Sequence, residues 1–158
     1  IYAFDLHKHK IDLIEKGAAR LGIGIIHAQC RDALTPKQEL LGKADLVIAD
    51  VPCSGLGTIR KKPDVRFKEQ ESVKNLPKLQ LEILTSLAKY VKDGGRILYS
   101  TCTLRPQENQ EVVTTFLKEN MELLPENTEA AYTEAASVFP VFLTLLFLSM
   151  RNVLRMII

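Results

Sequence analysis

Cysteine is scarce in this sequence, with three residues in 158 and no Cys-x-x-Cys pair. A small, odd number of separated cysteines excludes a disulfide framework and is typical of proteins from a reducing cytosol. The histidines, His7, His9 and His27, lack the spacing of zinc ligands, so no metal is expected. The sequence opens without the features of a signal peptide. It begins at Ile1, inside an expected strand, which indicates a segment of a longer, cytoplasmic protein.

An excess of charge of one sign is also lacking, because 21 basic and 19 acidic residues leave a net charge of +2. The whole-chain charge therefore does not indicate a nucleic-acid partner. One almost wholly apolar run, 135–150, falls short of the roughly 20 residues that a membrane-spanning helix needs. Core strands are its expected form, and no membrane partner is expected. The length, with 46% hydrophobic and 25% charged residues, predicts one ordinary globular domain.

Apolar periodicity predicts strands that alternate with helices. Short apolar runs bounded by turn residues predict strands over 1–5, 23–28, 44–50 and 96–100. Apolar residues at spacings of three and four predict helices over 9–21, 76–91 and 112–117. Asp93-Gly94-Gly95 predicts a turn before the last strand. The alternation predicts an α/β fold with a parallel sheet, and the polar segment 55–75 is expected to form a loop over the site.

Two short strings place a cysteine just after a predicted strand: Asp50-Val-Pro-Cys-Ser-Gly55 and Ser100-Thr-Cys-Thr103. Residues beyond neighbouring ends of parallel strands meet in one crevice, where ligands bind. Two thiols there, one beside a carboxylate, indicate nucleophilic chemistry on a polarised ring such as cytosine. A thiolate that adds to C6 makes C5 able to accept a methyl group. The alternative is a pair of buried structural cysteines, since free cysteine is among the most buried residue types.

With these strings the sequence resembles the Sun-type RNA 5-methylcytosine methyltransferases, and most closely the bacterial small-subunit ribosomal RNA enzymes. The resemblance rests on 50–64 and 100–109, with Tyr2-Ala-Phe-Asp5 and Arg20-Leu-Gly22, and it covers roughly the first 120 residues. It implies a class I S-adenosylmethionine-dependent methyltransferase (Rossmann-like) sheet of order 3-2-1-4-5 with an added antiparallel pair. The first strand of that sheet and its glycine loop have no counterpart in this sequence. The implied cofactor is S-adenosyl-L-methionine, and the implied partner is 16S ribosomal RNA.

The resemblance also implies roles for individual residues. Asp5 corresponds to the acid that binds the ribose hydroxyls of the cofactor, and Asp32 to the acid that contacts its adenine. Asp50 corresponds to the acid between cofactor and base, where it can stabilise charge as the thiolate adds. Cys102 corresponds to the nucleophile of the RNA enzymes, and Cys53 to the cysteine that assists product release. In DNA cytosine methyltransferases a Pro-Cys cysteine is itself the nucleophile, and local sequence alone does not separate the two roles.

A basic cluster follows the first cysteine string and contains Arg60, Lys61, Lys62, Arg66 and Lys68. Such a run is usually a solvated face. Beside a base-modifying site it is expected to grip RNA phosphates, which position the nucleic acid without reading its sequence.

We therefore predict a partial methyltransferase catalytic domain over 1–124 and a divergent apolar tail over 125–158, which lacks the Asp-Gly-Phe-Phe ending of the family. Without a glycine loop, the chain alone is expected neither to bind the cofactor usefully nor to methylate RNA. Two alternatives are a non-catalytic RNA-binding relic of such an enzyme and a cytosine methyltransferase that acts on another nucleic acid, such as DNA.

Overall fold

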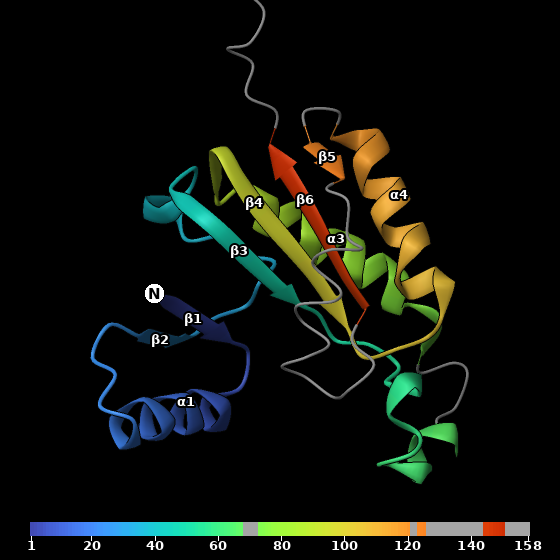
Figure 1. Ribbon diagram of the computed structural model, residues 1–158, viewed down its shortest axis with the longest axis horizontal. Coiled ribbons are helices and arrows are strands. Elements are labelled where there is room, and N and C mark those ends of the chain that lie inside the picture. The colour runs from blue at the N-terminus through green and yellow to red at the C-terminus, as the bar shows by residue number, and fades with distance from the viewer. Residues whose placement is uncertain (68–72, 121–122, 126–143, 151–158) are drawn as a thin grey trace, which may run out of the picture.

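The computed structural model describes residues 1–67, 73–120, 123–125 and 144–150. Within these residues β1 and β2 form a sheet of two parallel strands, and a second sheet has the order β3-β4-β6-β5 (Figure 1). The helices and strands are β1 (Tyr2–Asp5), α1 (Lys8–Arg20), β2 (His27–Cys30), β3 (Ala44–Asp50), α3 (Leu76–Ala88), β4 (Val91–Thr101), α4 (Gln110–Glu119), β5 (Leu123–Pro125) and β6 (Thr144–Met150). Short 3-10 turns are η1 (Gln38–Leu40), η2 (Leu56–Thr58), η3 (Pro63–Phe67) and η4 (Pro106–Glu108).

The predicted helices are confirmed, but the second predicted strand is misplaced. Strand β2 lies at 27–30 instead of 23–28, and residues 23–26 belong to no strand. Its position follows from its pairing with β1, in which Tyr2 lies opposite His27 and Asp5 opposite Cys30. Because β1 is only four residues long, β2 is equally short, and the apolar residues 23–26 form the connection that precedes β2.

Strand β4 begins before the predicted turn instead of after it. The glycines of that turn lie inside the strand, where the register against β3 shifts between Ala44 and Leu46. Gly94 has a φ of +72°, which an L side chain rarely adopts. At Gly95 a Cβ would lie 2.8 Å from the carbonyl oxygen of Ala44. The turn residues therefore form an irregularity that lets the two strands pair on both sides of it.

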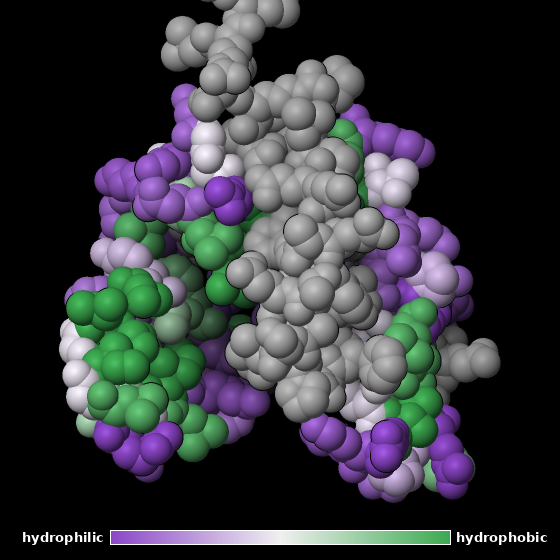
Figure 2. Space-filling view, viewed as in Figure 1, coloured by the Kyte–Doolittle hydropathy of each residue, from purple (hydrophilic) through white to green (hydrophobic). Residues whose placement is uncertain are grey.

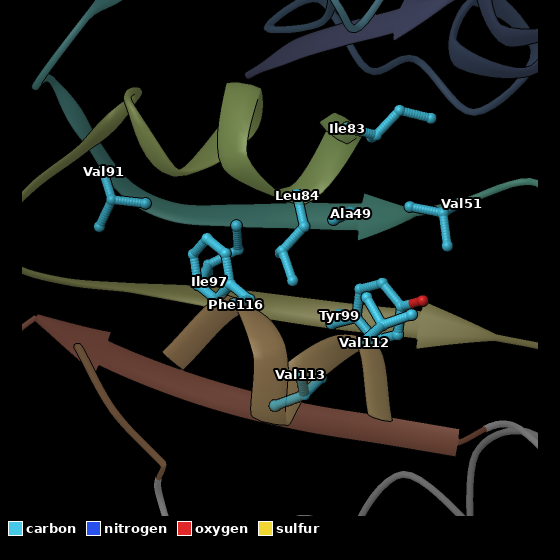
Figure 3. Close-up of a cluster of buried hydrophobic side chains, with 10 residues drawn as sticks. All are labelled: Ala49, Val51, Ile83, Leu84, Val91, Ile97, Tyr99, Val112, Val113 and Phe116. Carbon is cyan, nitrogen blue, oxygen red and sulfur yellow. The ribbon is translucent and has the colours of Figure 1, made fainter. Parts of the chain in front are cut away.

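The main core lies between the larger sheet and the two helices that cover one of its faces. Figure 3 shows side chains from β3, α3, β4 and α4 converging in one cluster. Leu84, Ile97, Tyr99 and Phe116 are its largest fully buried members. The parallel pair β3 and β4 is thereby fixed against α3 and α4, and the ends of these two strands carry the cysteines.

The order of the strands agrees with the Rossmann-like methyltransferase sheet that the resemblance implies. Strand β6 pairs antiparallel with β4 on one side and β5 on the other, and so supplies the antiparallel pair. Of the apolar run at 135–150, residues 144–150 form β6, and the rest lies outside the described residues. In the described part of the chain, β1 and β3 belong to separate sheets, and no strand pairs with both of them. The fold class is confirmed, including the lack of a first strand there.

The two sheets are joined through Tyr90, which follows α3. Its hydroxyl accepts a hydrogen bond from the backbone N–H of Lys37 at 2.6 Å, and its ring centroid lies 6.5 Å from that of Phe4 on β1. Ser86 adds a link by donating its hydroxyl to the carbonyl of Ala33 at 2.6 Å. These contacts hold β1, β2 and α1 beside the larger sheet, with β1 and β3 pointing the same way in Figure 1.

Apolar surface is exposed on the smaller sheet and on β3. In Figure 2 it gathers over β1, β2 and α1. Leu46 and Ile48, on the outward face of β3, are 50% and 62% exposed. An unpaired strand edge with apolar side chains is a surface on which another strand can pair. Across the described ranges, no helix has the length and hydropathy to cross a membrane, and no three His, Cys, Asp or Glu side chains gather as metal ligands.

Candidate active site

The two cysteine strings meet at the carboxyl ends of β3 and β4, as the parallel-sheet pattern predicts. The register of these strands places Asp50 opposite Ser100. Cys53 lies three residues beyond the end of β3, and Cys102 lies directly beyond the end of β4. Their Sγ atoms are 3.1 Å apart. Two thiols that are 49 residues apart in the sequence therefore form one pair, and both are half-buried.

Backbone contacts hold the two cysteine loops together. The N–H of Cys102 points at the Sγ of Cys53 at 3.3 Å, and the N–H of Gly57 donates to the carbonyl of Cys102 at 3.0 Å. Gly55 starts η2 with a φ of +75°, and a Cβ there would come within 4.0 Å of the Cys102 sulfur. That distance is an ordinary contact, so it is the positive φ of the turn that favours glycine at this position.

Burial and the neighbouring Cys102 determine the pKa of the Cys53 thiol. Burial, and after it the hydrogen bond with Cys102, raise the pKa of the Cys53 thiol to about 11. At neutral pH Cys53 therefore carries its proton and can donate a hydrogen bond to the Cys102 sulfur. A thiol pair of this kind can keep one sulfur protonated while the other acts as a nucleophile.

Asp50 ends β3 beside the thiol pair. Partial burial raises the pKa of its carboxyl, while the hydroxyl of Ser100, at 3.4 Å, and the charge of Lys10 on α1 act in the opposite direction. Lys10 had no predicted role, since it lies in a helix whose sequence pattern marks only its apolar face. Because its pKa is raised, this carboxyl keeps its proton to a higher pH than an ordinary aspartate, and when protonated it can donate as well as accept a hydrogen bond.

The two acids assigned to the cofactor lie at the ends of the smaller sheet. Asp5 ends β1, and one of its oxygens accepts the N–H of His7 at 2.8 Å. Asp32 follows β2 by two residues, and one of its oxygens accepts the N–H of Leu34 at 2.9 Å. An ionised carboxylate has about four acceptor sites, so both can take further donors, such as hydroxyls or an amino group.

The described part of the basic cluster is exposed. Arg60, Lys61 and Lys62 lie between η2 and η3, and Arg66 stacks over the ring of Phe67 with its guanidinium carbon 4.6 Å from the ring centroid. Lys68 lies outside the described residues. The N–H of Gly57 in η2 donates to the carbonyl of Cys102, so these cations follow closely on a turn that is hydrogen-bonded to the Cys102 loop.

A buried polar cluster behind the cysteines was not predicted from the sequence. It consists of Ser54, Gln80, Thr101, Thr103, Glu108 and Asn109. Glu108 and Asn109 belong to the second string of the resemblance, but charge and polarity alone suggest a surface position for them. The feature of the sequence that could have identified them is their closeness to Cys102.

Comparison with known proteins gives a consistent result. The family model of 16S rRNA methyltransferase RsmB/F matches residues 1–144. The Bacillus subtilis protein named "Probable ribosomal RNA small subunit methyltransferase B" is 41% identical over 128 residues, which are 80% of this chain and 29% of that relative. The chain thus spans less than a third of the relative's length.

Solved structures share the fold. A methyltransferase homologue from Pyrococcus horikoshii is 26% identical, with a TM-score of 0.67 over 82% of this chain and 39% of that one. A Streptococcus mutans protein in complex with SAH is 12% identical and has a TM-score of 0.56 over 95% of this chain and 75% of that one. At that identity the second likeness shows the fold alone.

Proposed function

This chain belongs to the RsmB/F family of 16S rRNA methyltransferases, and on that premise we propose that it carries the thiol chemistry of a cytoplasmic enzyme that methylates C5 of cytosine in 16S rRNA. The observation that carries this proposal is the thiol pair, Cys53 and Cys102, with 3.1 Å between the sulfurs. Cytosine needs one nucleophile at C6 and a second group near C5, and two adjacent thiols suit both needs. S-adenosylmethionine, when bound, supplies an electrophilic methyl group.

Cys102 acts as the nucleophile in this proposal. Its thiolate forms a C–S bond to C6, and the electron pair displaced from the C5–C6 double bond makes C5 nucleophilic. After C5 has gained the methyl group, its proton leaves to a base, the double bond re-forms and the C–S bond breaks. The raised pKa of Cys53 supports this division, because a protonated thiol is a poor nucleophile.

Cys53 assists the release of the product. Part of the rise in its pKa comes from the hydrogen bond and charge of Cys102, and bonding of Cys102 to C6 removes that part. Burial, the larger cause, remains. The pKa of Cys53 therefore falls once the adduct has formed, although burial keeps it above the ordinary value, and a larger fraction of the thiol can ionise and take the C5 proton.

The remaining residues hold the substrate and the cofactor. Asp50 faces the N3–N4 edge of cytosine, where a carboxyl with a raised pKa can donate a hydrogen bond to N3. Asp5 and Asp32 would accept hydrogen bonds from the ribose hydroxyls and the adenine amino group of the cofactor. Their positions at strand ends and their remaining acceptor sites fit these donors. The exposed cations near η2 and η3 would bind RNA phosphates.

The test uses a chimera in which this chain replaces its matched segment of the Bacillus subtilis relative. Labelled 16S rRNA and S-adenosylmethionine are added, and covalent adducts are separated on a denaturing gel. Cys102→Ala should abolish both methylation and adduct, because addition cannot begin. Cys53→Ala should accumulate a stable adduct, because elimination stalls. An adduct in Cys102→Ala alone would reverse the roles, and RNA binding with no methylation by the unsubstituted chimera would refute the enzyme.

A further inference from the structure

Two adjacent buried residues, Glu108 and Asn109, each form hydrogen bonds to the loop that carries one of the cysteines. Glu108 lies at the end of η4, Asn109 directly follows it, and their exposed fractions are 0% and 2%. Both lie within seven positions of Cys102 in the sequence, yet their side chains bind different loops. One reaches the loop of Cys53 and the other the loop of Cys102.

Glu108 binds the loop of Cys53. Its Oε2 atom accepts the backbone N–H of Ser54 at 2.8 Å and the side-chain amide of Gln80 at 3.0 Å. The same amide of Gln80 donates to the carbonyl of Pro52 at 2.9 Å. The peptide groups on both sides of Cys53 are thereby fixed. Arg105 balances the buried charge through Oε1 at 3.3 Å, as a carboxylate removed from water requires.

Asn109 binds the loop of Cys102. Its Nδ2 atom donates to the carbonyl of Thr103 at 3.0 Å, and its Oδ1 accepts the hydroxyl of Thr101 at 2.5 Å. The residues on both sides of Cys102 are therefore held by one amide. The hydroxyls of Ser54 and Thr103, 2.7 Å apart, connect the two loops directly.

From this arrangement we infer that Glu108 and Asn109, with Gln80, are positioning residues that set the separation of the two sulfurs. The network satisfies buried polar groups, and because its bonds go to the residues flanking both thiols it also fixes the backbone that carries each sulfur. The importance of this separation for catalysis rests on the proposed function, because both sulfurs must then reach one cytosine ring. Preorganisation by buried groups behind a site keeps reacting atoms within a narrow range of geometry.

The test measures the effective concentration of one thiol at the other, without RNA or cofactor. The chain carrying Cys30→Ser is equilibrated with reduced and oxidised glutathione, and mass spectrometry gives the fraction with a Cys53–Cys102 disulfide. In this exchange one oxidised glutathione is reduced to two thiols as the protein disulfide forms. Glu108→Gln removes the charge while keeping the size of the side chain, and Asn109→Asp removes the donor to Thr103. Each should lower the effective concentration at least about 10-fold, which is about 30 mV in reduction potential.

Matched controls separate positioning from stability. Glu111→Gln changes an exposed residue on α4, and Asn120→Asp removes a hydrogen bond to the carbonyl of Phe116, away from the cysteines. Val113→Ala lowers stability through the core alone. All three should leave the effective concentration within about twofold. A fall in Val113→Ala as large as in Glu108→Gln and Asn109→Asp, or no fall in those two, would overturn the inference. The result is independent of whether the chimera methylates RNA, so the two proposals can fail separately.

Discussion

The rate of alkylation of Cys53 should rise with pH along a titration curve whose midpoint lies near pH 11 instead of near pH 9. Burial and the hydrogen bond with Cys102 raise the pKa of the thiol from 9.0 to about 11. At pH 8 a thiol with the ordinary value is about 9% thiolate, whereas Cys53 would be about 0.1% thiolate. Because the thiolate is the species that reacts, the ionisation effect alone lowers the rate about 100-fold. Iodoacetamide rates between pH 7 and pH 11.5, followed by peptide mass spectrometry, give the titration curve.

The midpoint of that curve, not the absolute rate, tests the reasoning, since limited access to a half-buried sulfur slows the reaction at every pH. A single-cysteine peptide supplies the unperturbed curve under the same conditions. In Cys102→Ala the midpoint of Cys53 should fall, because the neighbouring sulfur no longer raises the pKa, but it should stay above that of the peptide, because burial persists. A Cys53 midpoint equal to that of the peptide in the unsubstituted chain would refute both the desolvation and the thiol coupling.

Four further outcomes are expected. Replacing Arg60, Lys61 and Lys62 together by glutamine should weaken RNA binding and reduce the magnitude of the slope of log affinity against log salt by about 2. A binding series over salt concentration measures this slope, and an unchanged slope would show that the three residues form a solvated face. Tyr90→Phe should speed hydrogen exchange in β1 and β2 more than in β3 and β4, because it removes the 2.6 Å bond to Lys37, in the segment that follows β2; uniform change would contradict this. The free energy of unfolding should fall as pH rises from 9 to 11, because the folded state favours the protonated thiol of Cys53 and loses this stabilisation as the thiol ionises. Urea titrations at each pH would measure the free energy of unfolding, with Cys53→Ala as control. Calorimetric titration of this chain with S-adenosylmethionine should show no saturable binding at micromolar concentration, since in the described residues no strand with a glycine-rich turn pairs with both β1 and β3. Saturable binding would show that the acids suffice.

The meeting of the two cysteines could be predicted from the sequence because it depends on rules that act locally. Apolar runs marked β3 and β4, and neighbouring parallel strands end at the same edge of a sheet. The observed pairing of Asp50 with Ser100 then fixes Cys53 and Cys102 at comparable positions beyond those ends. The helices also follow from local spacing, since α3 and α4 each bury one apolar stripe.

The position of β2 and the burial of Glu108 could not be predicted in this way, because long-range contacts decide both. The run at 23–26 is more apolar than 27–30, but the pairing with β1 selects the latter. Glu108 is charged, and its burial is tolerable because Gln80, 28 residues away, and the backbone of Ser54 donate to it, in addition to the nearby Arg105. No periodic pattern in the sequence reports such partners.

The two halves of the proposed site are built with different rigidity. Cys53 and Cys102 lie just beyond the ends of adjacent strands of one sheet, with a core and a buried polar network behind them. Asp5 ends one strand of a two-stranded sheet and Asp32 follows the other, and this sheet contacts the larger one through Tyr90 and its neighbours. A two-stranded sheet is marginally stable alone. The geometry of the thiols is therefore fixed within this chain, whereas the distance from the two acids to the thiols depends on the contacts around Tyr90. A perturbation there should therefore shift the two acids before it affects the thiol pair.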